Sequence, residues 1–286
     1  MKYGVSSYSF YQYIKQGKMT QLDCIAKAKE MGFDAIEFID IDGKGDYALQ
    51  VENAKKLRAE ADRLDMKIIA YTIGACLYND SEEKNRKEVE RLKGQLDIAK
   101  ILGASVMRHD VCYTLGKTGA SRSFDLMLPT IATLARQVTE YGESLGIRTC
   151  TENHGFIAQD SDRVERLFNA VAHDNYGLLV DVGNFACADE FSPHAVSRVA
   201  PYAVHVHVKD MKISEEPVEG AILTRAGTYL TCTAVGEGDI PVKRCLRILK
   251  KAGYDGYVSI EYEGAEDCIE GIAKGLANLK RYISEI

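Results

Sequence analysis

Acidic and histidine side chains end four consecutive apolar segments in the second half of the sequence. The segments are TENH (151–154), VDVGN (180–184), HVHVKD (205–210) and IEYEG (260–264). Three carboxylates and one imidazole that converge form a donor set well matched to a divalent metal ion. Ionised carboxylates in a protein core must be paired or bind a cation, because burying a lone charge is costly. The pattern therefore predicts a metal site formed by Glu152, Asp181, His205 or His207, and Glu261.

The segment VHVHVKD also has a simpler interpretation. Valine at every second position is typical of a buried strand, which places His205 and His207 on its other face. A single histidine in such a strand is more often a core residue than a ligand. Lys209 could neutralise the neighbouring carboxylates without any metal. The metal site is favoured because four consecutive segments each end in a potential metal ligand.

A strand-like run followed by an amphipathic run occurs eight times along the chain. The expected strands are 3–10, 34–40, 67–74, 105–111, 148–154, 176–184, 203–210 and 256–264. The expected helices are 21–32, 48–65, 82–103, 124–146, 161–172, 192–200, 242–253 and 267–286, several of which end in glycine, the usual residue after a helix.

Strands that alternate with helices predict a parallel sheet, and eight units predict a closed α/β barrel, the (β/α)8 TIM barrel. No linker divides the chain, so residues 1–286 are expected to form a single domain. An open doubly wound sheet is the alternative, weakened by the absence of a G-x-G-x-x-G turn after the first strand. In these barrels the active site lies at the carboxyl ends of the strands, where the four polar segments end.

The four segments, in this order, resemble the xylose isomerase-like TIM barrels. That superfamily includes sugar phosphate isomerases and epimerases, ketose 3-epimerases, inosose-processing enzymes and endonuclease IV. The segment VGEGDIPV (235–242) resembles the part of the family that precedes the eighth unit. The resemblance implies one divalent metal ion bound by Glu152, Asp181, His207 and Glu261. His207 is chosen over His205 because it lies three residues before an aspartate.

The oxygen-rich donor set favours Mn²⁺, Mg²⁺ or Co²⁺, with Zn²⁺ also possible. Such a metal would polarise a sugar carbonyl, make the neighbouring C–H more acidic and stabilise the resulting ene-diolate. By the resemblance, Glu152 and Glu261 are also the catalytic base and acid of a sugar or sugar phosphate isomerase or epimerase. Loss of a β-hydroxyl would instead make the enzyme an inosose or keto-sugar dehydratase or lyase.

Further residues are expected to bind the substrate: Lys209, His154, Arg108, Asn184, Glu37, Tyr8 and Arg225. Arg108 could bind a hydroxyl or phosphate, or pair with a carboxylate of the site, and Lys209 and His154 have similar alternatives. Glu37 and Tyr8 come from early strands and are expected in the pocket wall. Arg225 lies in the long connection 211–239, where a lid and a small hairpin are expected, and could meet a phosphate or a partner subunit.

An endonuclease IV-like nuclease is less well supported. Asn184 stands where that enzyme has a further histidine ligand, and residues 211–239 contain no histidine. The net charge of −6 and the absence of a basic run make nucleic acid an unexpected partner. A barrel kept only as a binding or regulatory protein would be expected to lose ligands, whereas all four are present here.

Composition is that of an ordinary globular protein, with 46% hydrophobic and 27% charged residues. No apolar run approaches the roughly 18 residues of a membrane span, so no membrane partner is expected. The first residues, MKYGVSSYSF, lack a signal-peptide core, and the eight cysteines form no C-x-x-C pair. A cytoplasmic enzyme with reduced thiols and a sugar or polyol substrate is expected, as a homodimer or homotetramer by the resemblance.

Overall fold

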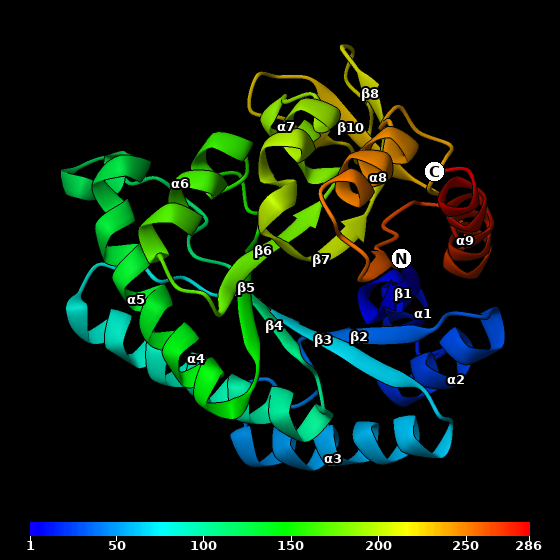
Figure 1. Cartoon of the computed structure of the whole chain (residues 1–286), viewed down its shortest axis with the longest axis horizontal. Coiled ribbons are helices and arrows are strands. Elements are labelled where there is room, and N and C mark those ends of the chain that lie inside the picture. Colours follow the sequence, from blue (N-terminus) through cyan, green and yellow to red (C-terminus); the bar gives the residue numbers. More distant parts are fainter.

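Eight parallel strands form one closed barrel in the computed structural model, which describes residues 1–286 (Figure 1). Around the barrel the strands follow the order β1-β11-β7-β6-β5-β4-β3-β2. They are β1 (Lys2–Ser6), β2 (Ala35–Ile39), β3 (Lys67–Ile73), β4 (Val106–His109), β5 (Arg148–Glu152), β6 (Tyr176–Asp181), β7 (Ala203–Val208) and β11 (Tyr257–Ile260). The predicted (β/α)8 barrel is confirmed.

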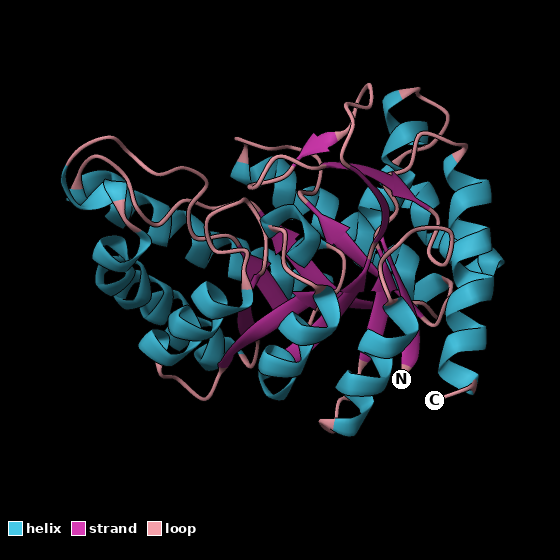
Figure 2. Ribbon diagram, turned by 90° about the horizontal axis from the view of Figure 1, so that it is seen from above, coloured by secondary structure: helices cyan, strands magenta, loops and turns pink.

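Helices surround the strands on the outside of the barrel (Figure 2). They are α2 (Gln21–Met31), α3 (Tyr47–Arg63), α4 (Glu82–Leu102), α5 (Phe124–Leu145), α6 (Ser161–Val171), α7 (Ser192–Val199), α8 (Val242–Lys251) and α9 (Cys268–Ser284). Gly32, Gly103 and Gly146 follow α2, α4 and α5 with φ of 84°, 73° and 73°. Glycine adopts this left-handed conformation without a Cβ clash, which explains why these helices end where the sequence predicts.

The alternating residues of β7 separate the barrel wall from its interior. Val206 and Val208 are fully buried members of the hydrophobic core. His205 and His207 both contact Glu37 of β2, although β11 and β1 lie between β7 and β2 in the barrel order. A contact between strands so far apart must cross the barrel interior. The two histidines therefore point inward, as the alternation predicts.

The first unit departs from the expected pattern. β1 ends at Ser6, where the predicted strand continued to residue 10, and a 3₁₀ turn over Ser7–Phe10 leads into a short helix α1 (Tyr11–Lys15). The Ser6 hydroxyl caps this turn by accepting a hydrogen bond from the backbone N–H of Tyr8, at 3.3 Å. Serine favours such caps over continued extended structure. Tyr8 thus lies in the turn after the strand, at the mouth of the barrel.

The long connection after β7 forms a small antiparallel sheet. Its strands are β8 (Asp210–Ser214), β9 (Ile222–Leu223) and β10 (Tyr229–Thr233), in the order β8-β10-β9, and β9 with β10 forms the expected hairpin. Asp210 fixes the return of this connection. Its carboxylate accepts hydrogen bonds from the backbone N–H groups of Gly236, Gly238 and Ile240 at 2.7, 3.1 and 3.1 Å. The aspartate that ends HVHVKD therefore holds the segment VGEGDIPV in place.

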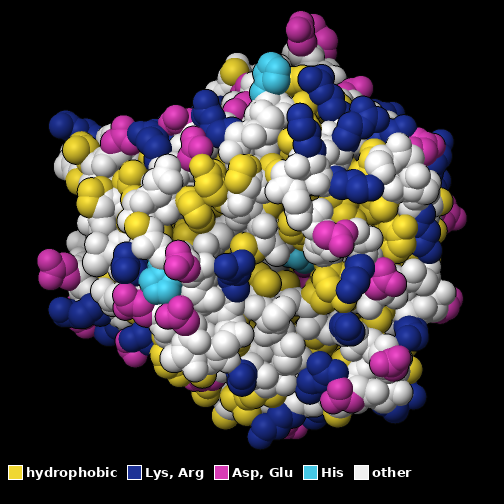
Figure 3. Space-filling model, in the orientation of Figure 1, with side chains coloured by type: hydrophobic (Ala, Val, Ile, Leu, Met, Phe, Trp, Pro, Cys, Tyr) yellow, Lys and Arg dark blue, Asp and Glu magenta, His cyan; other side chains and the backbone are white.

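Acidic and basic side chains lie close together over most of the face shown in Figure 3. None of the helices combines the length and the apolar character that a crossing of the bilayer would require.

Candidate metal centre and substrate cavity

Four strands that are neighbours in the barrel bring the predicted ligands together. Glu152 ends β5, Asp181 ends β6, His207 lies in β7 and Glu261 directly follows β11. Asp181 and His207 are partners in the register of β6 and β7. One potential ligand atom from each of the four residues lies within 4.8 Å of every other, and all four side chains are buried. The grouping proposed from the sequence is thus present in the structure.

Three buried polar atoms in this group form no hydrogen bond: Glu152 Oε2, His207 Nδ1 and Asp181 Oδ2. Glu152 Oε2 has an ion-pair partner, since it lies 2.8 Å from Arg108, whereas His207 Nδ1 and Asp181 Oδ2 have no partner this close. The nearest cation to Asp181 Oδ2 is Lys209 Nζ at 3.8 Å, and His207 Nδ1 lies 3.8 Å from Glu152 Oε1 and from Glu261 Oε1. Buried polar atoms are almost always satisfied, so unpaired ones need an explanation. A divalent cation between the four side chains would satisfy both atoms.

Electrostatics at the centre also favour a cation. Burial, together with the negative charges of Glu152 and Glu261, raises the pKa of Asp181 to about 7 although Lys209 opposes the shift. Burial would lower the pKa of His207, but Glu37 and Glu261 raise it well above its ordinary value. Both shifts mean that the group attracts protons at neutral pH. A metal ion would take the place of these protons.

Glu37 lies beneath the centre and holds His207. Its two carboxylate oxygens accept hydrogen bonds from His207 Nε2 and His205 Nε2, and Ser259 Oγ donates to it at 3.1 Å. Burial would raise the pKa of Glu37, but the two histidines hold it well below its usual range. An ionised carboxylate only accepts, so His207 donates from Nε2, and its Nδ1, the nitrogen left for a metal ion, lies 3.8 Å from Glu152 and from Glu261. A carboxylate behind a histidine is the usual support of a metal-binding imidazole.

The prediction that Glu37 forms part of the pocket wall does not match its position. Glu37 lies in the middle of β2, two residues before the strand ends at Ile39, and its side chain is fully buried. It therefore lies one layer below the mouth of the barrel. His205 likewise contacts Glu37 and lies outside the group of four.

A cavity of about 430 Å³ opens above the centre. Five of the predicted substrate-binding residues line it together with Glu261: Tyr8, Arg108, His154, Asn184 and Lys209. The volume falls within the usual range of small-molecule pockets. One of the predicted metal ligands, Glu261, and most of the predicted pocket residues therefore face one space.

The two buried cations of the cavity, Arg108 and Lys209, are paired with carboxylates. Lys209 Nζ lies 2.7 Å from Glu261 Oε2 and 2.6 Å from Glu263 Oε1. Arg108 lies 2.8 Å from Glu152 Oε2 and 3.1 Å from Asp110 Oδ2. The sequence left open whether these cations bind substrate or pair with carboxylates, and the structure shows the ion pairs. Asn184 adds a further contact, since its Nδ2 donates to Glu152 Oε1 at 2.9 Å.

His154 and Asp110 form a pair at the edge of the cavity. His154 Nδ1 lies 3.0 Å from Asp110 Oδ1, and the hydroxyl of Tyr113 donates to Asp110 Oδ2 at 2.9 Å. Burial would lower the pKa of His154, but Asp110 raises it. Asp110 and Tyr113 were not among the predicted residues. Asp110 directly follows β4, and the same position at the end of a strand was the basis for predicting the other site residues.

Arg225 lies away from the cavity, contrary to the prediction that it binds substrate. Its guanidinium pairs with Asp160 at 2.7 Å and donates to the backbone carbonyl of Phe156 at 2.6 Å. These contacts fasten the connection after β7 to the segment after β5. The residue therefore supports the surroundings of the site without lining it.

Comparisons with known proteins agree with this architecture. The model of the family described as xylose isomerase-like TIM barrel matches residues 25–282. An inosose dehydratase of Clostridium perfringens is 23% identical, covering 92% of this chain and 88% of that protein. The crystal structure of the IOLI protein with a bound zinc atom has a TM-score of 0.75 at 18% identity, covering 100% and 99% of the two chains.

A D-tagatose 3-epimerase-like protein has a TM-score of 0.72 at 22% identity, covering 99% of this chain and 97% of that chain. These similarities to solved structures show the fold. The family match covers most of the sequence, and the resemblance inferred from the four segments is confirmed. The chain belongs to the xylose isomerase-like TIM barrel family.

Proposed function

We propose that this chain is a divalent-metal-dependent isomerase or epimerase that moves a proton next to the carbonyl of a sugar or polyol. The observation that carries the proposal is the buried group of Glu152, Asp181, His207 and Glu261, in which His207 Nδ1 and Asp181 Oδ2 are unpaired, next to a ligand-sized cavity that Glu261 lines. When bound there, a divalent ion supplies Lewis acidity that polarises a carbonyl and acidifies its neighbouring C–H. The three carboxylates suit Mn²⁺, Mg²⁺ or Co²⁺, and the zinc in the IOLI structure supports Zn²⁺ as a further candidate.

Glu152 and Glu261 are the proposed proton-transfer residues. They come from β5 and from the end of β11, the outer two of the four neighbouring strands, so they flank Asp181 and His207. Carboxylates on two sides of the reacting carbon can remove a proton from one face and return one to the other. Arg108 and Asn184 hold Glu152, and Lys209 holds Glu261. This support fixes each carboxylate for general acid–base work.

The paired cations support a substrate without a phosphate. Arg108 and Lys209 each contact two carboxylates, and Lys44 at the rim pairs with Asp40 at 2.9 Å. An anionic group entering the cavity would have to compete with these partners. Hydroxyl groups, in contrast, can donate to the same carboxylates and accept from the same cations. A neutral keto-sugar or inosose therefore fits better than a sugar phosphate.

Dehydration of a keto-sugar or inosose is the second candidate. The pair of His154 and Asp110 favours it, because the Nε2 of His154 is left for a proton-transfer role beside the cavity. In this reaction a carboxylate takes the proton next to the carbonyl and His154 protonates the departing β-hydroxyl. A carbon–carbon double bond forms and water leaves. The similarity to inosose dehydratases supports the same alternative.

A cytoplasmic location and a homodimer or homotetramer are also proposed. All eight cysteines are free, which suits a reducing compartment. The oligomeric state rests on the resemblance to the family.

The test is a screen of metal-reconstituted protein with ketoses and inososes in D₂O, followed by NMR. An isomerase or epimerase should exchange the proton next to the carbonyl and produce the isomeric sugar, whereas a dehydratase should produce an enone. Absence of both exchange and product for every sugar, with the metal bound, would contradict the proposed function.

A further inference from the structure

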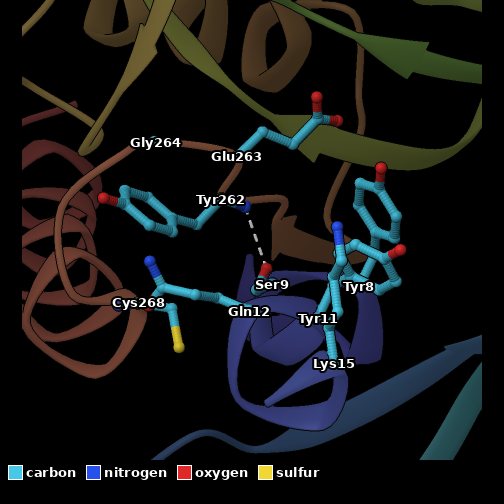
Figure 4. A pocket seen from close by; sticks show the side chains of 9 residues that line it. All are labelled: Tyr8, Ser9, Tyr11, Gln12, Lys15, Tyr262, Glu263, Gly264 and Cys268. Atoms are coloured by element: carbon cyan, nitrogen blue, oxygen red, sulfur yellow. Dashed lines mark hydrogen bonds between the residues drawn. The ribbon is translucent and has the colours of Figure 1, made fainter.

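A second pocket of about 290 Å³ adjoins the substrate cavity. Its walls are the 3₁₀ turn and α1 on one side and the segment after β11 on the other (Figure 4). Tyr8 and Glu263 line both this side pocket and the substrate cavity. These two side chains therefore form the boundary between the cavity and the side pocket. None of the predicted site residues except Tyr8 contributes to it.

Aromatic rings and unpaired polar groups form one wall of the side pocket. Tyr8 and Tyr11 stack with centroids 5.5 Å apart and 23° between their planes, and Tyr11 is 50% exposed. The ammonium of Lys15 lies 6.0 Å from the Tyr11 ring and forms no ion pair. No hydrogen bond within the chain uses the hydroxyl of Tyr8 or of Tyr11. Figure 4 shows these three side chains together, opposite the segment that carries Glu263.

The framework of the side pocket is rigidly fixed to the barrel. The hydroxyl of Ser9 donates to the carbonyl of Ile260 at 3.0 Å and accepts from the N–H of Tyr262 at 2.9 Å. The amide of Gln12 donates to the carbonyl of Glu266 at 3.2 Å and accepts from the N–H of Cys268 at 3.0 Å. These bonds leave the aromatic wall and Lys15 free while they hold the backbone on both sides. A preformed pocket of this kind loses little entropy when a ligand binds.

The chemistry of the wall suits a sugar ring. Each ring has C–H faces that can pack on an aromatic side chain, while its hydroxyls require donors and acceptors. The Tyr8–Tyr11 stack offers the apolar surface, and the two hydroxyls, Lys15 and Glu263 offer polar partners. A purely apolar ligand would leave the two hydroxyls and Lys15 without a partner, and a strongly anionic one would meet Glu263 at the entrance.

We propose that the side pocket is a subsite for a second sugar ring, so that the substrate is a glycosylated keto-sugar. The keto-sugar ring occupies the cavity above Glu152 and Glu261, and the outer ring packs against Tyr8 and Tyr11. This assignment rests on the proposed function only for the reaction of the first ring, because binding of the outer ring is measurable without turnover.

The first arm of the experiment measures binding. The ligands are maltulose and isomaltulose, two glucosyl-fructoses. Saturation-transfer-difference NMR of the metal-reconstituted protein should detect saturation of the protons of their glucosyl ring. Tyr11→Ala should reduce that saturation strongly, and Tyr11→Phe should keep most of it because the ring remains. Tyr47→Ala removes a tyrosine of similar exposure outside both pockets and serves as the control. Circular dichroism and thermal melts verify that each variant is folded.

The second arm compares exchange of the proton next to the carbonyl in D₂O. The kcat/KM for the disaccharides should exceed that for fructose, and Tyr11→Ala should lower this ratio about two- to tenfold, the range typical of one aromatic contact. One outcome is that the outer ring is saturated, that Tyr11→Ala removes this saturation, and that no proton next to the carbonyl exchanges. This outcome would uphold the subsite and count against the proposed function. Exchange of fructose and the disaccharides at equal kcat/KM, with no outer-ring saturation, would overturn the subsite and leave the function standing. Equal effects of Tyr11→Ala and Tyr47→Ala would also overturn it.

Discussion

Replacement of Glu37 by glutamine would separate the charge behind the metal centre from its geometry. Glu37 accepts hydrogen bonds from His207 and His205 in a fully buried position. A glutamine in the same place can accept the proton of His207 with its carbonyl oxygen, and its amide can donate to His205 Nε2 when that ring carries its proton on Nδ1. The shape and both contacts can therefore remain, while the negative charge is lost.

The expected effect is a loss of metal affinity of about 10- to 100-fold, as is usual when the partner of a metal-binding histidine is changed. That range corresponds to about 1.4 to 2.7 kcal/mol of binding free energy. Glu37→Leu should lose more, because it also leaves the ring N–H groups of both histidines buried without an acceptor. Each such orphaned group costs about 1 to 3 kcal/mol, so the leucine variant should unfold at a lower urea concentration as well.

The assay is competition with a chromophoric chelator, supported by the visible spectrum of the Co²⁺-loaded protein. Glu88→Gln is the matched control, since Glu88 is a largely buried carboxylate that pairs with Arg91 and contacts none of the four proposed ligands. It should leave the metal affinity unchanged. If Glu37→Gln and Glu37→Leu both bind Co²⁺ as wild type does, with the same spectrum, then Glu37 does not orient His207 and the argument fails.

Three further outcomes are expected. Glu152→Gln and Glu261→Gln should each lower turnover by about 10²- to 10⁴-fold at saturating metal, measured as initial rates, and near wild-type rates would reduce both residues to ligands. Removal of the metal with EDTA should lower the melting temperature, because a ligand at 100 times its Kd stabilises the native state by about 2.7 kcal/mol. If a protein shown to bind metal has the same melting curve with and without EDTA, the metal site does not form only on folding. Burial would raise the pKa of Asp110, but Arg108 and His154 lower it below the ordinary value of 3.8. The ionised Asp110 therefore stabilises the fold fully above pH 3.8, and this stabilisation is lost as the pH falls through the lower folded-state pKa. In urea unfolding, the wild type should be more stable than Asp110→Asn near neutral pH, and this difference should vanish in acid. A stability difference that does not change with pH would refute the role of Asp110.

The barrel and the ligand group could be predicted because both follow from periodic signals. Strand-like and helical runs alternate eight times, and parallel strands end at the same mouth, so residues at strand ends such as Asp181 and Glu152 must converge. The choice of His207 over His205 came from the family resemblance, and the structure places His207 in the group of four.

Other features depend on depth and on contacts across the barrel, which the sequence does not display. Glu37 lies only two residues before its strand ends, yet this offset moves it from the mouth to the layer beneath. Its contacts with His205 and His207 join β2 to β7 across the interior. Arg225 was a plausible ligand for a phosphate, but its partner Asp160 lies in another connection that folding alone brings close.

The pairing of His154 with Asp110 was hidden for a similar reason. The two residues are 44 positions apart and belong to adjacent units of the barrel. Tyr11 was hidden because the first strand-like run appeared to continue to residue 10, so the short helix α1 and the side pocket beside it were not expected.

Metal content measured on purified, reconstituted protein tests the central claim most directly. Elemental analysis should find about one divalent ion per chain in the wild type, a sharp loss in His207→Ala, and a much smaller loss in His205→Ala, because only His207 directs a free ring nitrogen at Glu152 and Glu261. Circular dichroism of each variant distinguishes a lost ligand from a lost fold. Equal loss in two folded variants, or a wild type that retains no metal, would contradict the account.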